Sequence, residues 1–188
     1  MSGCTASLTF RCLLANHGRP KRECSVDGSE RSGSRAKADI DGLKKNYHYR
    51  VPDVNSRGCY FLCYAEFIVN SEKRTVVVLL RGVDSHEIFA RGIAKAAPDD
   101  CFNVWLGKAI ALHRALGLEV PDEYLNTPQP TEVRVGDVVH NLSFGYTKTV
   151  SEIRDERIIY ENAKWCDQIR HVSEGRIKII DDSRTEVI

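Results

Sequence analysis

Residues 73–120 constrain the fold of this chain more than any other segment, because two strand-like runs and a capped amphipathic helix follow one another there without a gap. Residues 75–80 are β-branched or aliphatic and have charged residues on both sides, a pattern that favours a strand. Residues 82–85 are turn formers, and residues 88–94 resume an extended, partly alternating pattern. Together these features predict a β-hairpin.

A helix is predicted directly after this hairpin. Pro98 ends the extended run, and Asp99 or Asp100 can accept hydrogen bonds from the first free amides of a helix. Apolar residues and one histidine then recur at helical spacing and would form a single stripe: Phe102, Trp105, Leu106, Ala109, Ile110, His113 and Leu116. Gly117 stands where a left-handed C-cap residue belongs. The expected product is an antiparallel sheet with one main helix packed on it.

The residues GIAKAAPDDCFNVWLGKAIALHRALG, at positions 92–117, resemble a module of small, uncharacterised bacteriophage proteins. In that module a hairpin is followed by a Pro-Asp/Glu-Asp cap, a Phe-Asn or similar pair, a mid-helix Gly-Lys or Gly-Arg, and a closing Arg-Ala-Leu-Gly. Proteins with different roles share it, so the resemblance implies a phage origin rather than an activity. It also implies a cytoplasmic location in an infected bacterial cell.

The last third of the chain has the pattern of a small all-β unit. Short strand-like runs separated by turn residues occur at 135–139, 147–153, 157–160, 168–172 and 176–180. Closely spaced short strands predict a small barrel or a strongly bent sheet. The opening Val-Arg-Val-Gly-Asp-Val-Val resembles the first strand of SH3-like barrels.

The expected fold class is therefore α+β, with an antiparallel sheet and one main packed helix followed by a small all-β SH3-like barrel. Residues 1–46 are rich in Ser, Gly, Arg and Lys and predict a disordered arm. The sheet-and-helix unit is expected at 47–120, a Pro-containing linker at 121–131 and the barrel at 132–188. No stretch approaches the ~20 apolar residues of a membrane span, so we expect no membrane partner.

Charge and motifs argue against several function classes. The chain has 27 Lys and Arg residues against 26 Asp and Glu, and a formal net charge of +1 creates no strong global field. We find no phosphate loop, dinucleotide fingerprint, H-E-x-x-H or G-x-S-x-G motif. The spacing between Cys59 and Cys63 is not the usual zinc-ligand spacing. We therefore expect no catalytic residue, no cofactor and no metal, and an enzyme dependent on Cys101 is the weakest alternative.

The sequence favours a non-catalytic binding protein that sequesters a host protein or a nucleotide signal. Basic and amide side chains near the predicted hairpin and helix are candidates for contacting a ligand: Arg81, Arg91, Lys95, Asn103 and Arg114. A solvated charged face is the alternative interpretation of these residues. An uncovered sheet face would favour a homo-oligomer.

Nucleic-acid binding through the C-terminal unit is the alternative function. Its candidate residues are basic or aromatic: Lys148, Arg154, Arg157, Lys164, Trp165 and Arg170. Acidic residues interleave with them, which weakens this alternative. The aromatic residues between Tyr47 and Phe67 could stack on bases, but at strand spacing they favour packing within the protein.

Overall fold

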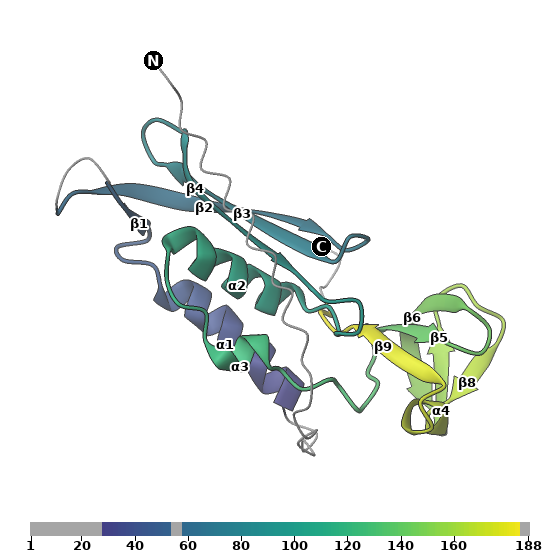
Figure 1. The fold of residues 1–188 in the computed structure, drawn as a ribbon. Coiled ribbons are helices and arrows are strands. Elements are labelled where there is room, and N and C mark those ends of the chain that lie inside the picture. Colours follow the sequence, from purple (N-terminus) through teal and green to yellow (C-terminus); the bar gives the residue numbers. More distant parts are fainter. Residues whose placement is uncertain (1–27, 54–57, 185–188) are drawn as a thin grey trace.

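The computed structural model describes residues 28–53 and 58–184, and it confirms an α+β architecture of antiparallel sheets with few helices (Figure 1). The first sheet has the strand order β1-β2-β3-β4, and every neighbouring pair is antiparallel. Its strands are β1 (Tyr49–Pro52), β2 (Tyr60–Asn70), β3 (Thr75–Gly82) and β4 (Ile88–Lys95). The pairing of β3 with β4 confirms the predicted hairpin.

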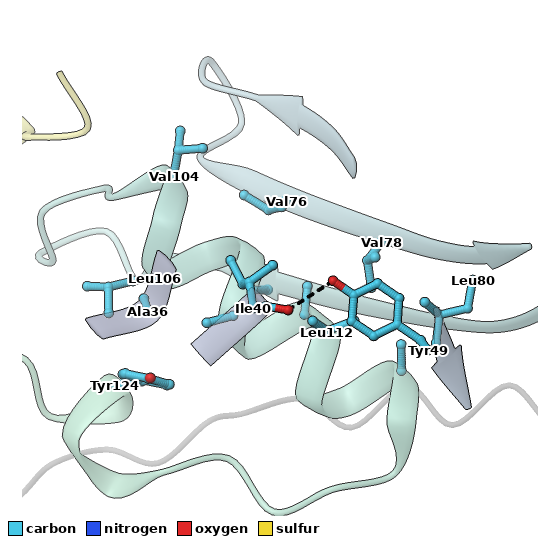
Figure 2. Packing of buried hydrophobic residues seen from close by; sticks show 14 of the residues in the cluster. Ala36, Ile40, Tyr49, Val76, Val78, Leu80, Val104, Leu106, Leu112 and Tyr124 are labelled. Carbon is cyan, nitrogen blue, oxygen red and sulfur yellow. Dashed lines mark hydrogen bonds between the residues drawn. The ribbon is translucent and has the colours of Figure 1, made fainter. Parts of the chain in front are cut away.

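Helix α2 (Val104–Leu116) packs on one face of this sheet, against β3 and β4. We call this face the inner face of the first sheet. Alternate side chains of β3 point to it, and Val76, Val78 and Leu80 are each fully buried there (Figure 2). Because side chains alternate along a strand, the intervening residues of β3 lie on the opposite face.

A second helix, α1 (Gly28–Gly42), packs on α2, where the sequence predicted a disordered arm and only one main helix. Ala36 is fully buried, and the Tyr49 hydroxyl donates a 3.0 Å hydrogen bond to the Ile40 carbonyl (Figure 2). Burial raises the pKa of Tyr49 to about 12. The prediction was wrong for this segment because tertiary packing, rather than helix propensity, stabilises α1. Residues 1–27 of the predicted arm lie outside the described residues.

Asn103, not Asp99 or Asp100, is the N-cap of α2. Its Oδ1 accepts hydrogen bonds from the amides of Trp105 and Leu106, at 3.0 and 3.1 Å. The predicted C-cap is confirmed, because Gly117 is left-handed with a φ of 68°. The expected linker also contains the short helix α3 (Asp122–Leu125), whose Tyr124 is buried against the core.

The second sheet has the strand order β8-β7-β6-β5-β9. Its elements are β5 (Val138–Asn141), β6 (Tyr146–Arg154), β7 (Arg157–Tyr160), β8 (Cys166–Gln168), helix α4 (Arg170–Ser173) and β9 (Ile177–Asp181). The run 168–172 was predicted as a strand, but most of it forms α4. The apolar core of this unit includes Val139, Val150, Ile158, Ile177 and Ile179.

The end of β9 returns to the first unit and binds the start of α2. The Phe102 amide donates to the Ile180 carbonyl at 2.8 Å, and Asn103 Nδ2 donates to Asp182 Oδ1 at 2.9 Å. The Val104 amide donates to Ser183 Oγ, also at 2.9 Å. The two units are therefore connected at this junction as well as through the linker.

We expect the substitution Asn103→Ala to lower the free energy of unfolding by about 1–2 kcal/mol, because it removes the N-cap and the contact with Asp182. Urea denaturation followed by circular dichroism would measure the loss. Asn126→Ala is the matched control, since Asn126 is exposed and its side chain donates to the Asp122 carbonyl one turn earlier, and we expect a change within about 0.5 kcal/mol. Equal midpoints for both variants would contradict the capping role.

Candidate functional site

The face of the first sheet opposite α2, which we call the outer face, is the main candidate functional surface. Helices α1, α2 and α3 lie on the other side of this sheet (Figure 1). Strand alternation places even-numbered residues of β2 and odd-numbered residues of β3 and β4 on the outer face, with a bulge at the Arg81 end. Its apolar members are Tyr60, Leu62, Tyr64, Ile68, Val77, Leu79, Ile88 and Ile93.

The most apolar row of the outer face is Ile68–Val77–Ile93. Ile68 is in register with Val77, and Val77 is in register with Ile93, so the three side chains lie side by side on three adjacent strands. Ile68 is 47% exposed and Ile93 is 51% exposed, whereas Val76 and Val78 on the inner face are 0% exposed. Leu62, on the same face, is 45% exposed. This surface is therefore apolar and open to solvent.

The charged side chains of the outer face are mainly basic. Arg50, Arg81, Arg91 and Lys95 share the face with Glu66. Arg81 Nε forms a 2.6 Å ion pair with Glu66 Oε2, and the Arg50 guanidinium lies 4.3 Å from the Tyr60 ring centroid. Glu66 is thus already paired within the face, which leaves an excess of positive charge.

The structure divides the predicted ligand-binding residues into two groups. Arg81, Arg91 and Lys95 lie on the outer face. Asn103 is the cap of α2, and Arg114 Nη1 donates a 2.6 Å hydrogen bond to the Ile93 carbonyl. The last two side chains therefore have structural roles and lie apart from the outer face.

The clustered aromatic residues also divide between the two faces of the sheet. Tyr49 is 2% exposed and belongs to the core, and Phe67 packs against that core, as the sequence predicts. Tyr60 and Tyr64, in contrast, are exposed on the outer face. The Tyr64 hydroxyl lies 3.3 Å from His86 Nδ1.

The basic residues proposed for nucleic-acid binding come from several elements of the second unit. Lys148 and Arg154 belong to β6, Arg157 to β7 and Arg170 to α4, whereas Lys164 and Trp165 precede β8. Arg154 Nη2 forms a 2.6 Å ion pair with Glu152. Trp165 is 52% exposed and lies next to Tyr146.

Cys101 has surroundings that oppose a nucleophilic role. Burial raises the pKa of its thiol, and the carboxylates of Asp182, Asp181 and Asp137 raise it further. A nucleophilic cysteine needs the opposite shift, because the thiolate is the reactive form. The described residues contain no group of three or more His, Cys, Asp or Glu side chains that could hold a metal ion.

The aliphatic residues of the outer face were not among the site residues predicted from the sequence. The available signal was in β2 and β3, where apolar residues occupy both alternating positions: Leu62 and Cys63, Ile68 and Val69, Val76 and Val77. A strand that is apolar on both faces is either buried on both or open to a partner, and sequence does not distinguish these cases.

No described helix is both long and apolar enough to cross a membrane. Comparisons with protein-family models, with curated proteins and with solved structures found no match for this chain.

Proposed function

We propose that this chain is a non-catalytic binding protein and that the outer face of its first sheet binds a partner protein. The single observation that carries the proposal is the apolar row Ile68–Val77–Ile93 on the outer face, in which Ile68 and Ile93 are exposed and Val77 between them is half-buried. Contiguous apolar surface of this kind is characteristic of interaction sites. The resemblance to phage proteins supports a host protein as the partner.

The charges on the outer face favour a partner with acidic residues around an apolar centre. Arg91 and Lys95 lie on β4, two residues to either side of Ile93, so basic side chains flank the apolar row there. Arg50 belongs to β1 and shares the outer face farther along the sheet, opposite Leu62. A second copy of this chain would bring basic side chains against basic side chains, with Glu66 already paired to Arg81. Complementary charges at the margin of an interface favour encounter and reject wrong partners.

A protein fits this surface better than a nucleotide signal or a nucleic acid. Aliphatic side chains occupy its centre and offer neither hydrogen bonds to phosphate nor flat faces for bases. Arg50 already stacks on Tyr60, one of the two exposed tyrosines of the outer face. An apolar core with a polar rim is the usual anatomy of a protein interface.

We further propose that the second sheet is an SH3-like barrel that braces the first unit. The strand order, with β9 beside β5, and the short helix α4 before the last strand support this assignment. The hydrogen bonds from the end of β9 to the start of α2 support the bracing role.

The double substitution Ile68→Thr with Ile93→Thr tests the proposed function. Threonine keeps β-branching, so the strands should be retained while the apolar row is interrupted. Val69→Thr is the matched control, because Val69 is 38% exposed on the same strand but points to the inner face. We expect the double variant to weaken partner binding about tenfold or more, and the control to bind like the unaltered protein.

The measurement is native mass spectrometry of each protein purified from bacterial cells, followed by calorimetric titration with the protein that is identified. A co-purifying acidic protein that is lost only from the double variant would support the proposal. A symmetric dimer, a nucleic-acid adduct, or a partner that both variants retain would overturn it.

A further inference from the structure

Three aromatic rings gather on the surface of the second unit, away from the first sheet. Phe144 lies in the turn between β5 and β6, Tyr146 starts β6, and Trp165 precedes β8. The rings of Phe144 and Tyr146 are 6.4 Å apart and nearly parallel, at 14°. The Trp165 ring is 6.1 Å from Tyr146 at 68°. Phe144 is 78% exposed and Trp165 is 52% exposed, whereas Tyr146 between them is half-buried against the core, so the cluster opens to solvent mainly through its two outer rings.

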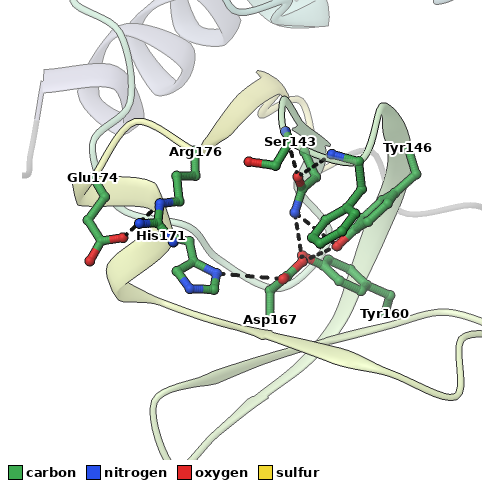
Figure 3. Close-up of polar contacts among 9 residues, drawn as sticks. Ser143, Tyr146, Tyr160, Asp167, His171, Glu174 and Arg176 are labelled. Atoms are coloured by element: carbon green, nitrogen blue, oxygen red, sulfur yellow. Dashed lines mark hydrogen bonds and ion pairs between the residues drawn. The ribbon is translucent and has the colours of Figure 1, made fainter.

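The turn that carries Phe144 is held by hydrogen bonds. Asn141 Oδ1 accepts from the amides of Ser143 and Phe144, at 2.9 and 3.1 Å (Figure 3). Gly145 follows with a left-handed φ of 70°. A side chain on such a turn loses little further backbone entropy when it binds a ligand.

A buried carboxylate lies behind the aromatic cluster. Asp167 Oδ2 accepts hydrogen bonds from the hydroxyls of Tyr146 and Tyr160, the latter at 2.8 Å (Figure 3). Asn141 Nδ2 lies 3.4 Å from the same oxygen, and His171 Nδ1 lies 3.6 Å from Oδ1. Burial raises the pKa of Asp167, but the three hydrogen bonds outweigh burial and lower it overall. Asp167 is therefore ionised at neutral pH.

These features make the Tyr146 ring a favourable surface for a cation. Aromatic faces carry negative electrostatic potential and attract ammonium and guanidinium groups. A hydroxyl that donates to a carboxylate increases the electron density of its ring, and the carboxylate adds its own negative charge. The carboxylate behind this ring contrasts with the basic side chains of the outer face.

Three rings of the first unit already have cations from this chain. Lys108 Nζ lies 4.4 Å from the Trp105 centroid and 5.5 Å from that of Phe67, and Arg50 lies over Tyr60. Within residues 28–53 and 58–184, no lysine or arginine lies over the rings of the aromatic cluster. We infer that the cluster of Phe144, Tyr146 and Trp165 binds the ammonium or guanidinium group of a basic segment of a protein partner.

The test is an NMR titration of the full chain, with the indole N–H of Trp165 as reporter and that of Trp105 as internal reference. The probes are tetramethylammonium chloride, its neutral counterpart tert-butanol, and a thymidine oligonucleotide. We expect a saturable shift of the Trp165 indole with tetramethylammonium, and a much weaker response to tert-butanol at the same concentration. The Trp105 indole should not respond.

Phe144→Leu removes a ring but keeps an apolar side chain, and we expect it to weaken tetramethylammonium binding about fivefold or more. Leu142→Ala is the matched control, because Leu142 lies in the same turn, is 59% exposed and has no ring. Retained dispersion of the amide spectrum would show that both variants fold. Equal responses to tetramethylammonium and tert-butanol, unchanged binding by Phe144→Leu, or ring-dependent binding of the oligonucleotide alone would overturn the inference.

Discussion

Replacing Gly92 with alanine should lower the free energy of unfolding by about 3 kcal/mol or more. A Cβ at Gly92 would lie 1.9 Å from the Ala111 carbonyl oxygen and 2.8 Å from the Ala115 amide nitrogen. Both atoms belong to the backbone of α2, so they cannot move away unless the helix shifts from β4. Overpacking of this kind typically costs about 1–3 kcal/mol, and more where no side chain can yield.

Urea denaturation followed by circular dichroism would measure this loss. Gly42→Ala is the matched control, because Gly42 has no atom within 4 Å of an added Cβ and does not have a left-handed φ. We expect the control to change stability by less than about 1 kcal/mol. If Gly92→Ala unfolded at the same urea concentration as the unaltered protein, the close contact between α2 and β4 would be contradicted.

Gly92 also shows where sequence-based prediction reaches its limit. The hairpin and α2 could be predicted because strand and helix periodicity are local properties of residues 75–116. The need for glycine at 92 arises from a helix that follows it in the chain and folds back on it, and no local pattern encodes that approach. The N-cap of α2 also depends on a distant segment. The end of β9 holds Phe102 by backbone hydrogen bonds, and this contact places Asn103 directly before the first turn of the helix.

Helix α1 and the outer face were missed for a common reason. The α1 segment is rich in serine and glycine, and its buried contacts through Ala36 and Ile40 are made with residues beyond position 48. On the outer face, Ile68 and Val77 have the same local pattern as core residues, and only the position of the helices shows that Ile68 is exposed and Val77 is half-buried. Both features depend on which surfaces of the first sheet and of α2 are covered by other elements, and this is a property of the tertiary structure.

The aromatic cluster could be predicted only in part. Trp165 was a candidate from its residue type, but Phe144 and Tyr146 were not. The hairpin of β5 and β6 brings Phe144 and Tyr146 close to Trp165. The Asp167 carboxylate holds Tyr146 there, because it links β8 to β6 through Tyr146 and to β7 through Tyr160. A buried network assembled from residues 141, 146, 160 and 167 has no signature in any single stretch of sequence.

The substitution Asp167→Asn should lower the free energy of unfolding by about 2–4 kcal/mol at pH 7. It keeps the side-chain shape but removes the charge that accepts hydrogen bonds from Tyr146 and Tyr160. Leaving buried donors with a weaker or wrongly oriented acceptor costs about 1–3 kcal/mol for neutral groups, and more where a charged group is involved. Asp155→Asn is the matched control, because Asp155 is exposed in the turn after β6, with a φ of 48° that asparagine tolerates.

The pH dependence of this loss distinguishes a charged network from simple packing. The folded-state pKa of Asp167 is below its ordinary value of 3.8, so the unfolded chain binds the proton more readily. The contribution of Asp167 is therefore complete above pH 3.8 and is lost as the pH falls through the lower, folded-state value. Burial raises the pKa of Asp137 and Asp181, so their contribution to the free energy of unfolding changes with pH in the opposite direction. Both residues are also present in the variant, and their contribution therefore cancels when the two proteins are compared. We expect the gap between Asp167→Asn and the unaltered protein, measured by urea denaturation, to shrink below about pH 3.8. A gap that stayed constant with pH would show that Asp167 stabilises the fold by its shape and not by its charge.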